Sequence, residues 1–215
     1  MANLEQAQIT FYHMTRCPDS GPIKLLLAHK DIKYTDAPIK HSEWPLKREE
    51  IITSRVPALR IQYPDGRLQW MTESKAILRC LGMQYGLLGR NDMEMYHCDR
   101  IIGKIIESDR LLKVFYKNRK FHDNDIKEYK ENVISGITHI LESIDRMLKD
   151  APGEYAAADI ITIADFYLLD FIDFLRANKP DCLKPYPYIE RWRKHLMQTD
   201  QLVAKFVVSR SWEIL

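Results

Sequence analysis

The stretch SRVPALRIQYPDGRLQWMTESKAILRCL, residues 54–81, decides the fold of this chain. It predicts two short strands joined by a Pro-Asp-Gly turn at 64–66, and a helix that begins at Glu73 and Ser74. Pro57 stands at the start of the first strand, where its missing amide removes no ladder hydrogen bond. The stretch therefore predicts a hairpin that leads directly into a helix.

The same stretch offers binding groups at its two ends. If the bond before Pro57 is cis, the backbone of Val56 turns outward and can pair with an extended peptide. Glu73 offers a carboxylate for an ammonium group, and Ser74 offers a hydroxyl beside free helix N-terminal amides for a carboxylate. A zwitterionic amino-acid head group fits this pair. A capped helix without a ligand is the structural alternative.

Composition excludes several classes of function. The 215 residues are 46% hydrophobic and 29% charged, which is ordinary for a globular protein with one or two domains. A net charge of +2, from 32 basic and 30 acidic residues, is too small to indicate nucleic-acid binding. No run of 18 apolar residues and no secretory signal pattern is present. The four cysteines form no CxxC pair, which argues against a zinc site and favours a cytoplasmic protein with free thiols.

Working outward, the residues before the hairpin alternate between strand and helix patterns. Strands are expected at 8–13 and 33–39, and helices from Pro22 and from Ser42. With the hairpin and its helix, the order is strand, helix, strand, helix, strand, strand, helix. This order predicts an α/β thioredoxin-like N-terminal domain with one parallel strand pair and an antiparallel edge.

After the segment GLLGRND, residues 86–92, only helical patterns remain. The expected helices are 93–117, 124–149, 162–176 and a last one after Pro187 that contains Trp192. The predicted organisation is a first domain at 1–86, a linker at 87–91 and an all-α C-terminal domain at 92–215. Thr162 and Asp165 have the spacing of a capping box at a helix start, a structural role.

Three side chains near the end of the first strand are candidates for thiol chemistry. Tyr12 and His13 point to opposite faces of a strand, so only one of them can face a cleft. A Tyr12 hydroxyl can donate to a thiolate, whereas His13 can carry a proton near neutrality. Cys17 precedes a helix whose dipole favours a thiolate. For each the alternative is structural: a core aromatic, a surface imidazole and an inert thiol.

A tryptophan and a lysine lie one turn apart in the segment after Ser42. The indole N–H of Trp44 and the ammonium of Lys47 can together hold a peptide carboxylate. A charged surface helix with a buried tryptophan is an equal alternative.

The motifs VPAL (56–59), ESKAILRCL (73–81) and TIADF (162–166), in this order and after GLLG before the long helix, resemble the cytosolic glutathione transferases over nearly the whole chain. The resemblance implies a thioredoxin-like domain that binds glutathione as co-substrate and a helical domain with a pocket for a hydrophobic electrophile. It also implies a twofold homodimer, in which Asp99 matches an acid that reaches glutathione in the neighbouring subunit.

The resemblance also implies a role for each site residue. The Val56 backbone beside Pro57 pairs with the cysteinyl residue of glutathione. Glu73 and Ser74 hold the γ-glutamyl group. Trp44 and Lys47 look like the residues that hold the glycyl carboxylate in the tyrosine-type classes, the sigma class in particular.

Different alignments of this chain to the family place different residues at the position that contacts the glutathione sulfur. A gapless alignment on PIKLLL places His13 at the tyrosine-type catalytic position, and a one-residue change in loop length restores Tyr12. The pair Cys17-Pro18 instead matches the omega-like cysteine classes. Trp44, Lys47 and Asp99 match residues found in the tyrosine-type classes. Tyr12 is therefore the preferred candidate for the residue that contacts the sulfur. The alternatives are an omega-like thiol transferase and a non-catalytic scaffold or assembly subunit.

Overall fold

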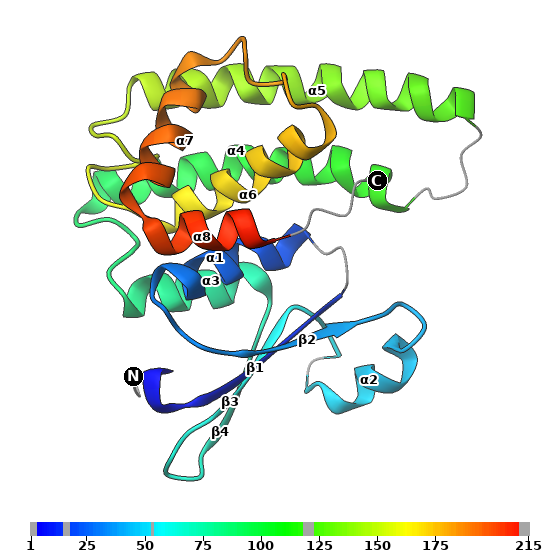
Figure 1. Cartoon of the computed structure of the whole chain (residues 1–215), viewed down its shortest axis with the longest axis vertical. Coiled ribbons are helices and arrows are strands. Elements are labelled where there is room, and N and C mark those ends of the chain that lie inside the picture. Colours follow the sequence, from blue (N-terminus) through cyan, green and yellow to red (C-terminus); the bar gives the residue numbers. More distant parts are fainter. Residues whose placement is uncertain (1–3, 15–17, 53, 118–122, 211–215) are drawn as a thin grey trace. The chain divides into compact units, whose positions relative to one another are not determined.

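The computed structural model describes residues 4–14, 18–52, 54–117 and 123–210 (Figure 1). The chain forms two compact units. The first contains Met1–Leu88 together with Met197–Leu215, and the second contains Gly89–Leu196.

A mixed sheet of four strands forms the centre of the first unit. The strands are β1 (Gln8–Met14), β2 (Thr35–Ile39), β3 (Ala58–Gln62) and β4 (Leu68–Thr72), in the spatial order β2-β1-β3-β4. β1 pairs with β2 in parallel and with β3 antiparallel, and β3 and β4 form the antiparallel hairpin. This topology confirms the predicted thioredoxin-like arrangement.

Helices and short turns complete the first unit. They are α1 (Gly21–His29), α2 (Trp44–Glu50), α3 (Ser74–Gln84), α8 (Gln201–Ser209) and 3-10 turns at Leu4–Gln6 and Pro18–Ser20. α1 and α3 lie side by side (Figure 1). α1 buries Ile23 and the run Leu25, Leu26 and Leu27, so that apolar burial holds this layer of the unit together.

The chain after α7 (Pro187–Thr199) differs from the expectation of a single last helix. A further helix, α8, begins where the Asp200 carboxylate accepts a hydrogen bond from the Val203 amide at 3.0 Å. The other oxygen of Asp200 lies 2.5 Å from Nδ1 of His29, at the end of α1. Burial raises the pKa of Asp200, but the bonds from His29 and Val203 outweigh it and hold this pKa below its ordinary value. Because α8 packs on α1, the C-terminal segment groups with the first unit.

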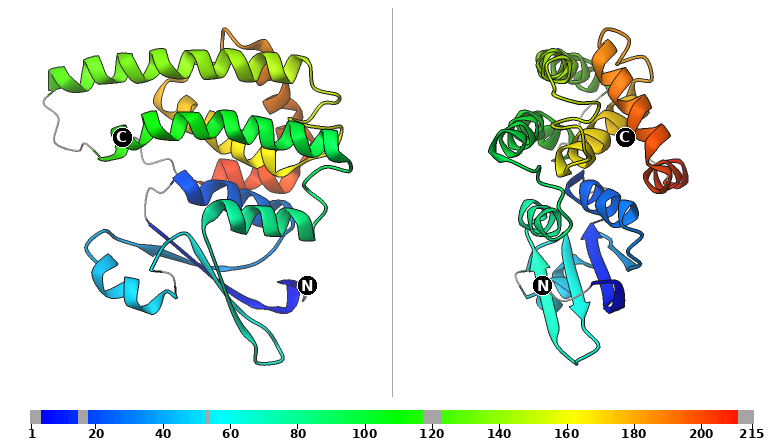
Figure 2. Two further views of the ribbon diagram at one scale, coloured as in Figure 1. Left: turned by 180° about the vertical axis from the view of Figure 1, so that it is seen from behind. Right: turned by 90° about the vertical axis from the view of Figure 1, so that its left-hand side faces the viewer.

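The second unit consists of α4 (Asp92–Lys117), α5 (Asp123–Lys149), α6 (Ile163–Asn178) and most of α7. α4 and α5 run alongside each other (Figure 2), and α4 also packs on α6. The described side chains of α6 are buried almost throughout its first three turns, so α6 is the core helix of this unit. Within the described ranges, no helix combines the length and the apolar character needed to cross a membrane.

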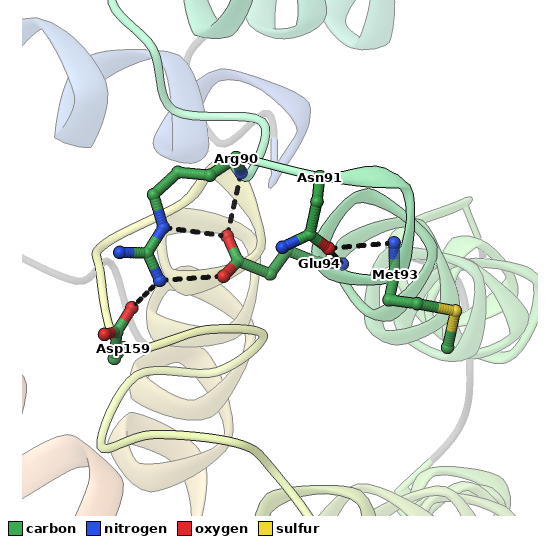
Figure 3. A network of polar contacts seen from close by, with 5 residues as sticks. All are labelled: Arg90, Asn91, Met93, Glu94 and Asp159. Atoms are coloured by element: carbon green, nitrogen blue, oxygen red, sulfur yellow. Dashed lines mark hydrogen bonds and ion pairs between the residues drawn. The ribbon is translucent and has the colours of Figure 1, made fainter.

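A polar network fixes the start of α4 (Figure 3). The side-chain oxygen of Asn91 accepts from the amides of Met93 and Glu94 at 3.1 and 3.0 Å, which is N-capping geometry. The guanidinium of Arg90 pairs with Glu94 at 2.8 Å and also with Asp159. Its hydrogen bonds hold the pKa of Glu94 below its ordinary value. The network ties the first turn of α4 to the loop before α6.

Asp165 is the polar centre of the second unit. Its carboxylate accepts from the Thr162 amide at 2.8 Å and the Thr162 hydroxyl at 3.0 Å, and the two residues form a capping box at the start of α6. It also accepts from the Ala156 amide and from the indole N–H of Trp192, both at 2.8 Å. Burial raises the pKa of Asp165, while these hydrogen bonds act in the opposite direction. One carboxylate thus joins α6, α7 and the loop between α5 and α6.

Candidate active site

The candidate site begins at the carboxyl end of β1. The side chains of this strand alternate, with Ile9, Phe11 and His13 buried and Tyr12 half-buried. Tyr12 therefore lies on the face of the sheet opposite to His13.

An apolar cluster surrounds Tyr12. Its buried centre is Ile39, Ile51 and Ala58, and the partly buried side chains packed against it are Tyr12, Met14, Trp44, Val56 and Trp70. The rings of Tyr12 and Trp70 stack with centroids 5.7 Å apart. Ala58 pairs directly with Tyr12 across the ladder, and its small side chain leaves room for the two rings to meet over β3. Three residues selected from the sequence, Tyr12, Trp44 and Val56, are thus brought together.

Lys47 adds a positive charge beside this cluster. It lies one turn after Trp44 on α2, and its ammonium pairs with the Glu50 carboxylate at 2.8 Å. The hydrogen bond that Lys47 donates to Glu50, together with the negative charge of Glu50, raises the pKa of Lys47. Within α2 the Lys47 ammonium is therefore paired with Glu50, one turn from Trp44.

His13 belongs to a separate polar network. Its Nδ1 lies 3.0 Å from the Met14 carbonyl oxygen, which only accepts, so Nδ1 carries a proton. Its Nε2 lies 3.0 Å from both the Asp36 carboxylate and the Lys24 ammonium. Lys24 and Asp36 in turn pair at 2.9 Å. The ring thus links β1, β2 and α1 on the face away from Tyr12. Cys17 lies outside the described residues.

The end of the hairpin carries the next group of candidates. The Val56-Pro57 peptide bond is cis. β3 starts at Ala58, which pairs with Thr72 of β4, so that Val56 and Glu73 lie at the same end of the hairpin.

Glu73 and Ser74 form the start of α3. Glu73 is the N-cap residue with φ +67°, a left-handed conformation that is rare for a residue with a side chain, and its side chain makes no capping hydrogen bond. The first helical bond runs from the Ile77 amide to the Glu73 carbonyl at 2.9 Å. The amides before Ile77 therefore have no acceptor within the helix and are available to an anion.

Asp99 is exposed on α4 of the second unit, beside the buried Cys98. Burial raises the pKa of the Cys98 thiol to about 11, so this thiol is a core group without nucleophilic character at neutral pH.

Two neighbours of the site were missed by the sequence analysis. Trp70 stacks on Tyr12, and the Arg55 guanidinium lies 3.5 Å from the Glu73 carboxylate. Strand alternation was a usable signal for Trp70. Trp70 and Thr72 share one face of β4, and Thr72 pairs with Ala58, which in turn pairs with Tyr12. Nothing in the sequence pattern pairs Arg55 with Glu73.

Known proteins share both the sequence pattern and the fold. Residues 108–210 match the family model described as glutathione S-transferase, C-terminal domain. The chain is 27% identical over 191 residues to the glutathione S-transferase class-mu 28 kDa isozyme of Schistosoma bovis, covering 88% of this chain and 89% of that protein. It is 29% identical over 178 residues to rabbit (Oryctolagus cuniculus) glutathione S-transferase Mu 1, covering 79% and 77%.

A solved structure is also similar to this chain over nearly its whole length. The sigma class glutathione transferase of Fasciola hepatica superposes with a TM-score of 0.83 at 26% identity, covering 96% of this chain and 98% of that one. The family model, the curated relatives and this structure match overlapping parts that together span nearly the whole chain. Together these matches support membership of this chain in the cytosolic glutathione transferase family.

Proposed function

We propose that this transferase conjugates the thiolate of glutathione to hydrophobic electrophiles, with the Tyr12 hydroxyl as the donor to the sulfur. The clustering of Tyr12 with Trp44 and Val56 on one face of the sheet carries the proposal. The family resemblance assigns the Tyr12 side chain to the sulfur, the Trp44 side chain to the glycyl carboxylate and the Val56 backbone to the cysteinyl residue. Pro57 sets the start of β3 beside them, and Lys47 adds a cation for the carboxylate.

The chemistry needs a stabilised thiolate and an electrophile held nearby. Lowering the pKa of the glutathione thiol by two units corresponds to about 2.7 kcal/mol. A phenol hydroxyl donates one hydrogen bond to the anion, which supplies a share of this energy. The sulfur lone pair then forms a bond to the electrophilic carbon, and a leaving group departs or the carbon skeleton accepts the electron pair. The electrophile pocket is assigned to the helical domain by the family resemblance.

The γ-glutamyl group is assigned to Glu73 and Ser74. The left-handed backbone of Glu73 supports this assignment, because such conformations persist where the surrounding structure holds them and they occur often at ligand sites. The Glu73 carboxylate matches the ammonium group of the ligand. The Ser74 hydroxyl and the free amides of α3 match its carboxylate.

Replacing Ser74 by alanine is expected to weaken glutathione binding roughly tenfold or more, the usual effect of losing one hydrogen bond to a charged group. The fold should be unaffected, since the lost partners belong to the ligand. Calorimetric titration of glutathione into Ser74→Ala measures the effect. Ser135→Ala, at an exposed position of α5, is the matched control. Unchanged affinity in Ser74→Ala would remove the γ-glutamyl assignment.

We also propose a twofold homodimer in which Asp99 reaches the glutathione of the partner subunit. Its exposure on α4 supports a role between subunits, since a twofold interface repeats the same surface on both copies. Asp99→Asn is expected to weaken glutathione binding about five- to tenfold, the equivalent of about 1 to 1.4 kcal/mol. Asp92→Asn, exposed in the first turn of the same helix, should bind normally. Sedimentation of a fully active monomer would contradict the dimer-dependent site.

We infer the cytoplasm as the compartment and detoxification as the role. Cys80, Cys98 and Cys182 form no disulfide bond, and reduced cysteines persist in reducing compartments. Conjugation of a hydrophobic electrophile to a charged peptide makes it water-soluble and removes its reactivity.

A further inference from the structure

A network of charged groups lies behind β1, on the face of the sheet away from Tyr12. The side chains of His13 and Lys24 are only 10% and 17% exposed, whereas that of Asp36 is 47% exposed and opens the network to solvent. Polar groups buried this far are costly unless they are hydrogen-bonded or paired. The chemistry proposed at Tyr12 gives none of these three groups a role.

The ring of His13 is held at both of its nitrogens. Nδ1 donates to the Met14 carbonyl oxygen at 3.0 Å, within β1 itself. Nε2 lies 3.0 Å from the Asp36 carboxylate of β2 and 3.0 Å from the Lys24 ammonium of α1. Lys24 and Asp36 also pair with each other at 2.9 Å. One ring therefore ties the carboxyl end of β1 both to the neighbouring strand and to α1.

Aromatic packing holds the same groups from the side. The ring centroids of Phe11 and His13 are 5.5 Å apart, and the Lys24 ammonium lies 5.7 Å from the centroid of the Phe11 ring. An aromatic face attracts a cation at this distance. Phe11 pairs with Asp36 across the ladder, and His13 lies two residues further along the same face. The network is thus packed against the strand that carries Tyr12.

The end of β1 has a neighbouring strand on one side only. The ladder between β1 and β3 runs from Gln8 to Tyr12, which pairs with Ala58. The ladder between β1 and β2 continues through His13 to Met14, and β2 is the edge strand of the sheet. In the part of the sheet that the structure describes, the last two residues of β1 are therefore paired with an edge strand alone. The His13 side chain adds an anchor at this point.

We propose that His13 is a positioning residue for conjugation, which braces the end of β1 against Asp36 and Lys24 and so holds the Tyr12 hydroxyl in place for the sulfur. The proposal rests on the proposed function, in which Tyr12 donates to the thiolate. Tyr12 and His13 are adjacent on one strand, so a shift of the backbone at His13 moves the Tyr12 side chain on the other face. A hydrogen bond weakens steeply when its distance and angle change, and a small displacement therefore lowers its contribution.

The test is a double-mutant cycle on the full chain, with an activated aryl halide as the electrophile. His13→Phe keeps an aromatic ring beside Phe11 and removes both ring nitrogens. It is expected to raise the pKa of the bound glutathione thiol by about half a unit to one unit, and to lower kcat about three- to tenfold below that pKa. The loss should shrink at alkaline pH, where the thiol is ionised in both proteins.

Two further readouts separate positioning from direct contact with the ligand. The KM for glutathione should change by less than about twofold in His13→Phe, because the ring acts through Tyr12 and does not touch glutathione. In the Tyr12→Phe background, His13→Phe should lower the rate no further, because the hydroxyl that it positions is already gone. An undiminished effect in that background overturns the proposal, since His13 would then act on the sulfur independently of Tyr12.

Two substitutions of similar shape locate the bond that matters. Glutamine carries its amide near the position of Nε2, and asparagine carries its amide near the position of Nδ1. His13→Gln still reaches Asp36 and Lys24 and should keep most of the rate. His13→Asn keeps only the bond to the Met14 carbonyl and should resemble His13→Phe. The reverse order overturns the proposed brace between β1, β2 and α1.

His29→Phe is the matched control, because His29 is also a partly buried, paired histidine of the first unit, 2.5 Å from Asp200. It should leave the thiol pKa and kcat at their parental values. An unchanged thiol pKa in His13→Phe overturns the proposal, and so does an equal shift in His29→Phe. If Tyr12→Phe alone keeps the parental rate, the proposed function fails and this inference with it. The single variant shows that result before any His13 substitution is compared.

Discussion

Tyr12→Phe is expected to lower the kcat/KM of glutathione conjugation by roughly one to three powers of ten, because the hydroxyl contributes about 1.4 to 4 kcal/mol to the transition state. The phenylalanine ring keeps the stacking on Trp70 and the packing against Ala58, so the change removes a hydrogen bond and little else. The measurement is the initial rate with an activated aryl halide. The ultraviolet absorbance of bound glutathione thiolate at neutral pH should fall in parallel.

Cys17→Ser is the decisive comparison for this result. With Tyr12 as the donor, the serine variant should conjugate at nearly the parental rate. A cysteine at the sulfur would instead form a mixed disulfide with glutathione and support thiol transfer. Loss of activity in Cys17→Ser with a silent Tyr12→Phe would therefore replace the tyrosine mechanism by the omega-like one. If neither substitution changes the rate and glutathione still binds, two explanations are left. A substitution at His13 tests the first, in which His13 contacts the sulfur; the second is a non-catalytic scaffold.

Asp165→Asn should lower the free energy of unfolding by roughly 3 to 5 kcal/mol, which is among the larger effects of a single substitution. The carboxylate accepts four hydrogen bonds from donors in three segments. An asparagine turns one of its two acceptor atoms into a donor. That amide group then faces buried N–H or O–H groups that have lost their acceptor, in a site without water access. Urea unfolding followed by circular dichroism measures the loss.

Two variants calibrate this effect. Asp159→Asn changes an exposed carboxylate in the preceding loop, and it should cost about 1 kcal/mol or less. Trp192→Phe removes one of the donors and keeps most of the ring, so its effect should lie between the two. A loss of less than about 1 kcal/mol in Asp165→Asn would contradict the view that Asp165 organises the second unit.

Much of the fold could be predicted, because it follows from patterns among residues that are close in sequence. The alternation along Gln8–Met14, the Pro-Asp-Gly turn before β4 and the helical periodicity after residue 92 each involve residues close in sequence. The capping box of Thr162 and Asp165 spans three residues and is equally local. These patterns are governed by backbone geometry and by which side of an element is apolar.

Contacts between distant segments could not be predicted in the same way. The sequence analysis expected no helix after the last one, although Asp200 caps α8 locally through the Val203 amide. The packing of α8 on α1 involves the contact of Asp200 with His29 across 171 positions of sequence, which no local pattern specifies. The further bonds of Asp165 to Ala156 and Trp192 likewise depend on packing, since the capping-box pattern specifies only the partner three residues away.

By itself, the sequence determined the order of the elements, the mixed sheet, the helical second part and the resemblance to a family. It also selected Tyr12, Trp44, Val56 and Glu73 as candidates, because each lies at or near the end of a predicted local element. Only the tertiary structure decided that Trp70 stacks on Tyr12, that His13 is held by Asp36 on the other face, and that Arg55 lies beside Glu73. The reason is physical: periodicity assigns a side chain to a face, but the neighbour it meets there depends on how separate strands and loops pack together.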